Sequence, residues 1–394
     1  MGSLTGPVLV LGAGATKACN GPLTNDILLE ADRSAINSTR PDYIALVDEF
    51  LTDVFRLPPK ATRIDTSYPS LPLLLSLIDT AIDRGQPLGL NYGVAKLREV
   101  RAAIEYTIFG VLEHKLQGGT PPFHRQAIDR LFPTPVEPQI ISLNYDIIAD
   151  NTLAARSADA FPDYGCEIQT ETYRTFRKFG KLFKLHGSLN WLYCPNCNRL
   201  DVAVSRSGHG FSKALNQLFT SEGGVVNDLE QRYSSGGSPC KNCGTLVRPV
   251  MITPTQRKDY RNPHIAQVWY KAEGLLRSAS SVVFVGYSMP ADDVEVAYLM
   301  KRGLAHLPAQ AITVIEFDKK NRGVSDHEVG QRYQSVFGPG IQWYTCGFEG
   351  WLKKAKPANS PRRPRPRVKS GSGAGLQAKK GTRIRHRSRR QRGM

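Results

Sequence analysis

The residues of this chain best suited to chemistry are a histidine and two C-x-x-C pairs that follow it. His186 precedes a glycine, Cys194 and Cys197 come a few residues later, and Cys240 and Cys243 follow after 42 intervening residues. Four thiolates can close a tetrahedral zinc site that has no open coordination position, so we predict a structural zinc ion. The alternative is a redox pair or unused thiols. Histidine, with an ordinary pKa of about 6.5, suits proton transfer, although a purely structural hydrogen bond is the other interpretation.

Short apolar runs with glycine or polar residues at their ends indicate the elements that position these groups. The runs are Pro7–Leu11, Gln139–Leu143, Lys181–Leu185, Val282–Val285 and Ile312–Ile315. Strands that are apolar throughout are typical of a buried parallel sheet, and the helix-length segments between them predict a Rossmann-like, doubly wound α/β fold. Because ligands of such sheets bind beyond the carboxyl ends of the strands, we expect the groups found there to share one site.

The first of these strand ends carries a glycine pair. Gly12-x-Gly14 would let the backbone approach a pyrophosphate, next to the amides of a helix N-terminus. Lys17 stands where a dinucleotide fingerprint has its third glycine. The pair therefore predicts either a nucleotide site or only a tight turn.

Polar groups follow two more strands. Asn144 and Asp146 could orient water or a ribose hydroxyl, and both residue types are also common helix caps. Glu316 and Asp318 follow the last run, where a carboxylate can accept hydrogen bonds from a ribose or lie in a surface loop.

Composition divides the chain into a nearly neutral body and a basic tail. The formal charge is +17, yet residues 351–394 hold 16 Lys or Arg and no Asp or Glu. We expect this tail to be disordered and either to bind nucleic acid or another polyanion, or only to aid solubility. No apolar run approaches the roughly 20 residues needed to span a bilayer, and we expect a cytoplasmic protein of unknown oligomeric state.

Two insertions are predicted within a single domain of residues 1–350. Residues from about 41 to 130 have helical apolar spacing, and residues from about 191 to 248 contain the cysteine pairs. We expect the two insertions to form a small helical and zinc-binding domain beside the sheet, with a cleft between.

The order of the motifs resembles the sirtuin family over residues 8–318. The motifs are Gly12-Ala13-Gly14-Ala15-Thr16, Leu143-Asn144-Tyr145-Asp146, Leu185-His186-Gly187-Ser188, the two cysteine pairs, Arg248-Pro249 and Val285-Gly286-Tyr287-Ser288. The resemblance implies that NAD is bound at its phosphates by residues 12–16, at the nicotinamide ribose by Asn144 and Asp146, and at the adenosine end by Gly286, Ser288 and Glu316. It also implies that His186 is catalytic and that the cysteines hold zinc.

Departures from the protein-deacylase pattern favour a divergent branch. Gly21-Pro22-Leu23-Thr24-Asn25-Asp26 replaces Gly-Ile-Pro-x-Phe-Arg, and the residues after Arg248-Pro249 lack the Phe-Gly-Glu segment. These features look more like microbial sirtuin-like proteins, several of which hydrolyse NAD in anti-phage defence. We expect water, held by His186 and Asn144, to cleave NAD into ADP-ribose and nicotinamide. The alternatives are NAD-dependent lysine deacylation and a non-catalytic NAD-sensing module whose tail binds nucleic acid.

Overall fold

A computed structural model gives the fold. It describes residues 5–33, 41–63, 67–116, 120–157, 160–202, 240, 242–245, 247–255, 258 and 260–354. All of them belong to one compact unit, Met1–Lys354. The basic tail after residue 354 lies outside the described residues, so its predicted disorder and its partners stay predictions.

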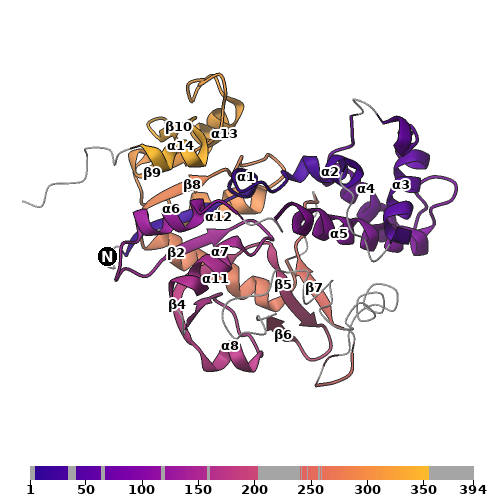
Figure 1. The fold of residues 1–394 in the computed structure, drawn as a ribbon, viewed down its shortest axis with the longest axis horizontal. Coiled ribbons are helices and arrows are strands. Elements are labelled where there is room, and N and C mark those ends of the chain that lie inside the picture. Colours follow the sequence, from indigo (N-terminus) through magenta and orange to yellow (C-terminus); the bar gives the residue numbers. More distant parts are fainter. Residues whose placement is uncertain are drawn as a thin grey trace, which may run out of the picture. The chain divides into compact units, whose positions relative to one another are not determined.

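A seven-stranded sheet forms the centre of this unit (Figure 1), and every strand pairing in it is parallel. Its strands, in spatial order, are β10 (Gln342–Tyr344), β9 (Ile312–Ile315), β8 (Ala279–Val285), β1 (Gly6–Leu11), β2 (Gln139–Ser142), β4 (Arg177–Lys184) and β3 (Ala160–Asp163). From β1 the chain first builds the sheet outward through β2 and then returns to the other side of β1 with β8. This topological switch point lies between β1 and β8, where Rossmann-like sheets bind their ligands.

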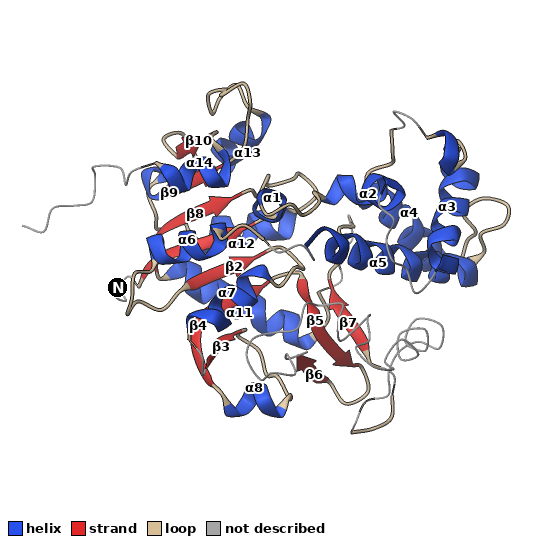
Figure 2. Ribbon diagram, viewed as in Figure 1, coloured by secondary structure: helices blue, strands red, loops and turns tan. Residues whose placement is uncertain are grey.

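Helices flank the sheet (Figure 2) in two groups whose members contact one another. One group is α1 (Ala13–Ala18), α14 (Gly347–Lys353), α6 (Phe123–Leu131) and α7 (Ile148–Arg156), and the other is α11 (Pro263–Arg277), α12 (Val294–Gly303) and α13 (Glu328–Phe337). The short helix α8 (Glu171–Thr175) precedes β4, and η3 (Ala309–Ala311) precedes β9. Burial of consecutive residues Val8, Leu9, Val10 and Leu11 shows that both faces of β1 are covered. The predicted doubly wound fold is confirmed.

A helical subdomain is inserted between β1 and β2. It comprises η1 (Thr24–Asp26), α2 (Ile27–Arg33), α3 (Pro41–Phe55), η2 (Lys60–Thr62), α4 (Leu71–Arg84) and α5 (Val94–Leu116), and α5 packs against α2, α3 and α4. Helix α6, by contrast, contacts α7 and α14 and so belongs to the layer that covers the sheet.

Helix α4 shows how local sequence builds this subdomain. The Ser70 hydroxyl caps its first turn by accepting from the Leu73 amide, and Gly85 ends it in the left-handed conformation. Leu74, Leu75 and Ile78 recur at helical spacing and are fully buried.

A small antiparallel sheet follows β4 directly. Its strand order is β6 (Arg199–Val202), β5 (Gly187–Cys194) and β7 (Arg248–Met251). Strand β5 begins at Gly187, immediately after His186, and ends at Cys194. Among the described residues, no helix is long and apolar enough to cross a membrane.

Candidate active site

The strand register brings the predicted residues to one edge of the sheet. Leu11 pairs with both Ser142 and Val285, Ser142 pairs with Lys184, and Val285 pairs with Ile315. These five residues form one level row across the sheet. The residues that follow them, which include the glycine loop, Asn144, His186, Gly286 and Glu316, therefore all leave the sheet at the same edge.

The loops after β1 and β8 are in backbone contact at this edge. A Cβ atom on Gly14 would lie 2.6 Å from the Cα of Gly286, and one on Gly286 would lie 2.4 Å from the Cα of Gly14. The amide of Gly14 donates to the Gly286 carbonyl at 2.7 Å, and that of Gly12 donates to Val285 at 3.0 Å. The packing of the two loops therefore requires glycine at positions 14 and 286. The backbone amides of Gly12 and Gly14 are already used in hydrogen bonds within the protein.

Asn144 and Asp146 fix the neighbouring loop. The Asn144 side-chain amide donates to the Gly12 carbonyl at 2.9 Å. One Asp146 oxygen accepts from the Thr16 hydroxyl at 2.5 Å and the other from the Ile148 amide at 3.0 Å. Asp146 thus ties the β2 loop to α1 and to the first residue of α7, and its contact with a water or a ribose hydroxyl stays a prediction.

A buried ion pair lies beneath the Asn144–Asp146 loop. Lys184 Nζ and Asp150 Oδ2 are 3.1 Å apart, and both side chains are fully buried. Lys184 also donates to the Asp146 carbonyl at 2.5 Å and to the Ser188 hydroxyl at 2.6 Å, while Asp150 accepts from Tyr164 at 2.5 Å. The hydrogen bonds satisfy both buried charges, so the network holds the loop rigidly against β4.

His186 is held in place by its backbone carbonyl, by the tightly packed glycine that follows it and by one ring nitrogen. Its carbonyl accepts from the Ile252 amide at 2.8 Å. Gly187, at φ +81°, follows it, and a Cβ there would lie 2.1 Å from the Val250 carbonyl oxygen. The Nδ1 atom is 3.1 Å from the Leu143 carbonyl, which selects the tautomer with hydrogen on Nδ1.

That tautomer leaves the other ring nitrogen as a buried lone pair. Nε2 is buried and has no hydrogen-bond partner among the described residues. Burial lowers the pKa of His186 below its ordinary value of 6.5, and Lys258 also lowers it, while Asp293 and Glu295 act in the opposite direction. The imidazole is therefore neutral at pH 7, the state in which Nε2 can accept a proton.

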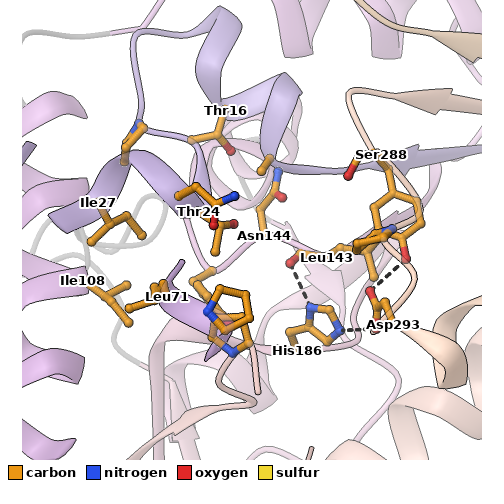
Figure 3. A pocket seen from close by; sticks show the side chains of 18 of the residues that line it. Thr16, Thr24, Ile27, Leu71, Ile108, Leu143, Asn144, His186, Ser288 and Asp293 are labelled. Carbon is orange, nitrogen blue, oxygen red and sulfur yellow. Dashed lines mark hydrogen bonds and ion pairs between the residues drawn. The ribbon is translucent and has the colours of Figure 1, made fainter. Parts of the chain in front are cut away.

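Asp293 lies beside this nitrogen and is held by Lys258 and Tyr287, three residues to which the sequence alone assigned no role. Asp293 Oδ1 lies 3.9 Å from Nε2 of His186 and 3.0 Å from Lys258 Nζ. The other Asp293 oxygen accepts from the Tyr287 hydroxyl at 2.8 Å. Figure 3 shows His186 between Leu143 and Asp293. The signal available in the sequence was Asp292-Asp293, a few residues past the end of an apolar strand.

These groups face a cavity of about 520 Å³, here called the site cavity. The volume lies within the range of small-molecule sites. Its polar part includes Asn144, Asp146, His186, Lys258 and Asp293. Its apolar part comes from α2, α4 and α5 through Ile27, Leu71, Ile108 and Leu112. Figure 3 shows Ile27, Leu71 and Ile108 together on the side of the cavity away from Asp293.

The predicted binding residues divide between those that line the site cavity and those that do not. Ala13, Thr16, Asn144, Asp146, His186, Gly286 and Ser288 line it, whereas Gly12, Gly14, Ala15 and Glu316 are not among its lining residues. The Glu316 carboxylate accepts from the Phe317 amide at 3.0 Å, and burial raises its pKa. The nucleotide-binding roles of these residues stay predictions.

The four predicted cysteines form one cluster. The Sγ atoms of Cys194 and Cys243 are 3.4 Å apart, and that of Cys197 is 3.7 Å from Cys240 and 3.8 Å from Cys243. Four sulfur atoms around zinc at about 2.3 Å would be separated by about 3.8 Å. All four ligand atoms lie within 4.8 Å of one another, so the donor set and its spacing fit a tetrahedral zinc ion.

The cysteine cluster is remote from His186 and would act on the fold. Cys194 ends the strand that begins at Gly187, a path of up to roughly 25 Å at about 3.3 Å per residue. The turn at the second pair is closed by hydrogen bonds between Cys240 and residues 244 and 245. A zinc ion there would have four thiolate ligands and would link the turn between β5 and β6 to the turn that holds Cys240 and Cys243.

Comparisons with known proteins yield only distant structural likenesses. A scan against models of known families gives no match, and a search of curated protein sequences gives none. Solved structures similar to the chain include a Sir2 homologue in complex with NAD (14% identity, 88% of this chain and 85% of that one, TM-score 0.38). They also include Sir2 with a p53 peptide and NAD+ (13% identity, 85% and 92%, TM-score 0.37) and Sir2Tm bound to a propionylated peptide (12% identity, 85% and 92%, TM-score 0.36). Likenesses this distant leave the chemistry of the site to be argued from its own residues.

Proposed function

We propose that the protein cleaves the nicotinamide–ribose bond of NAD+ with water as the acceptor, which yields ADP-ribose and nicotinamide. The observation that carries the proposal is the Nε2 atom of His186, a buried lone pair that faces the site cavity and has no hydrogen-bond partner in the described part of the chain. The site cavity opens at the switch point of a Rossmann-like sheet, where dinucleotides bind. The order of motifs along the chain, which resembles that of sirtuins, supports NAD as the dinucleotide.

The chemistry suits this arrangement. Nicotinamide leaves a cationic glycoside as a neutral base, so the ribose passes through an oxocarbenium-like state. The site must position the acceptor and stabilise the cation. A neutral imidazole can take the proton of the attacking water, and the buried carboxylate of Asp293 places negative charge beside it.

The proposed placement of NAD follows the polarity of the site cavity. We place the nicotinamide ribose at His186 and Asn144, where the polar groups gather. The pyrophosphate would lie toward Ala13 and Thr16 at the start of α1, and the adenosine end toward Gly286 and Ser288.

The test is incubation of the purified protein with NAD+ alone, with release of nicotinamide measured by chromatography. We expect release without any peptide. Release only when an acetylated lysine peptide is added would show lysine deacylation instead. No release in either case, together with a rise in melting temperature on addition of NAD+, would show a non-catalytic NAD-binding module.

A further inference from the structure

Asp293 occupies a helix N-cap position without capping the helix. Asp is a preferred N-cap residue because its carboxylate accepts from the amides of the first turn. Asp293 directly precedes α12, but its side chain makes no cap hydrogen bond. The carboxylate instead points toward His186 (Figure 3) and is buried, with 3% of the residue exposed.

Neighbouring side chains hold this carboxylate in place. Tyr287 donates to Oδ2 at 2.8 Å, and Lys258 Nζ lies 3.0 Å from Oδ1. Lys258 also donates to the Asp292 carbonyl at 3.1 Å, so the ammonium is itself fixed. Oδ1 makes an ion pair with Lys258 but no well-aligned hydrogen bond among the described residues.

Two buried acceptors therefore face each other at the wall of the site cavity. Nε2 of His186 and Oδ1 of Asp293 are 3.9 Å apart, which is too long for a direct hydrogen bond. A water oxygen about 2.8 Å from each, with both O–H bonds aimed at them, would span acceptors about 4.4 Å apart. The observed separation is close to that value.

We propose that His186 and Asp293 form an acceptor pair that holds the attacking water by both of its protons. The inference rests on the proposed function and deepens it. With both protons engaged, the free lone pairs of the water face the site cavity, where the glycosidic carbon is expected. The second acceptor for the water is thus Oδ1 of Asp293, which lies 3.9 Å from Nε2 of His186.

The step balances without any further reactant. The water oxygen forms a bond to the ribose C1′ carbon, and the C1′–N bond breaks with its electron pair remaining on nicotinamide. One water proton passes to Nε2 of His186, while Nδ1–H continues to donate to Leu143. The other proton stays on the new hydroxyl and is still donated to Asp293. Loss of the proton from His186 to solvent restores the site.

The experiment compares Asp293→Ala and Asp293→Asn with the wild type in the NAD+-only assay. We expect kcat to fall by about 100-fold or more in both, with KM changed by no more than about threefold. Asp293→Asn keeps the volume and therefore guards against loss of the fold, which a melting curve checks. Added formate should restore part of the rate of Asp293→Ala and none of the rate of His186→Ala.

The matched control is Asp201→Asn. Asp201 pairs with Arg199 at 2.6 Å on the small sheet and does not line the site cavity, so its variant should keep the wild-type rate. A wild-type protein that releases nicotinamide while both Asp293 variants stay within threefold of it overturns the inference alone. A wild-type protein that releases none overturns the proposed function together with the inference.

Discussion

At the scale of single residues, His186 is the side chain whose surroundings best fit a chemical role. Its backbone carbonyl and one ring nitrogen form hydrogen bonds within the fold, and the other nitrogen is buried with no partner among the residues that the structure describes. A buried acceptor left unsatisfied costs about 1–3 kcal/mol, so a ligand or water that donates a hydrogen bond to Nε2 would be stabilised here.

Replacement of His186 by alanine should abolish most of the turnover while it leaves the fold intact. Loss of a general base typically lowers kcat by a factor of about 10² to 10⁴. Nicotinamide release, the melting temperature and zinc content are the measurements. His114→Ala is the control, because His114 is exposed on α5 and does not line the site cavity. A His186→Ala protein with full activity would show that the base lies elsewhere.

Activity should depend on pH through the same imidazole. The neutral form is the base, and burial lowers the pKa of His186 below 6.5, with Asp293, Glu295 and Lys258 as the charged groups that modify it. We expect kcat/KM to be flat from about pH 7 to 8 and to fall at acidic pH, below the His186 pKa. A pH–rate profile checks this, and a rate that rises as the pH falls below 6.5 contradicts it.

The titration of His186 should lower the free energy of unfolding as the pH falls below 6.5. Because the folded-state pKa is depressed, the unfolded state binds the proton first as the pH falls below 6.5. The contribution of His186 is therefore present above pH 6.5 and is lost as the pH falls toward the folded-state pKa. Urea unfolding of the wild type and of His186→Ala at several pH values measures this contribution of His186 to the free energy of unfolding.

At the scale of elements, the contact between the β1 and β8 loops governs the site. Gly286→Ala would place a Cβ 2.4 Å from the Gly14 backbone, in a left-handed conformation at φ +61°. We expect a loss of about 2–4 kcal/mol in the free energy of unfolding, together with weaker NAD+ binding. Gly274→Ala is the matched control: nothing lies within 4 Å of its Cβ, and on α11 alanine should be neutral or stabilising. Equal stability of the two variants would contradict the account.

The cysteine cluster should act through folding and not through chemistry. Cys194→Ser should abolish stoichiometric zinc and lower the melting temperature markedly, because structural zinc supplies on the order of 10 kcal/mol of binding free energy. Cys346→Ser is the control, since Cys346 stands at the N-cap of α14, where serine is a favoured residue. Zinc analysis and thermal unfolding are the measurements, and a Cys194→Ser protein with full zinc content would refute the assignment.

Elements were predictable where one rule governs them. Buried apolar strands such as Val282–Val285 can be read from the sequence because a sheet covered on both faces admits little else. The edge strands β3 and β10 were not predicted, since three or four residues of mixed polarity carry no periodic signal.

The site was predictable only as far as strand ends reveal it. His186 and Asn144 stand directly after strands, and register alone brings them together. Lys258 reaches Asp293 across 35 residues of sequence from the loop after β7, and no local pattern encodes that meeting. The place of Asp293 in the site could not be predicted for a different reason: an Asp before a helix ordinarily indicates a helix cap.

At the scale of the whole molecule, charge separates a nearly neutral body from a basic tail. Residues 355–394 carry 14 Lys or Arg and no acid, and the described unit ends at Lys354. We propose that the tail binds duplex DNA, so a protein that ends at Lys354 should retain NAD+ cleavage and bind DNA much more weakly than the full chain.

Salt titration is the measurement that checks the tail. If six phosphates are neutralised, affinity of the full chain should fall by about 10³-fold between 50 and 200 mM salt. Equal DNA binding by the truncated and full-length proteins would show that the tail does not bind DNA, and a role in solubility would then be the remaining prediction.

The most direct test of the whole account is a crystal structure of the His186→Ala variant with NAD+. We predict the dinucleotide in the site cavity, with its glycosidic carbon facing position 186 and a water bound at Asp293. NAD+ bound with its nicotinamide ribose away from position 186, or no binding at the β1–β8 edge at all, would contradict the account.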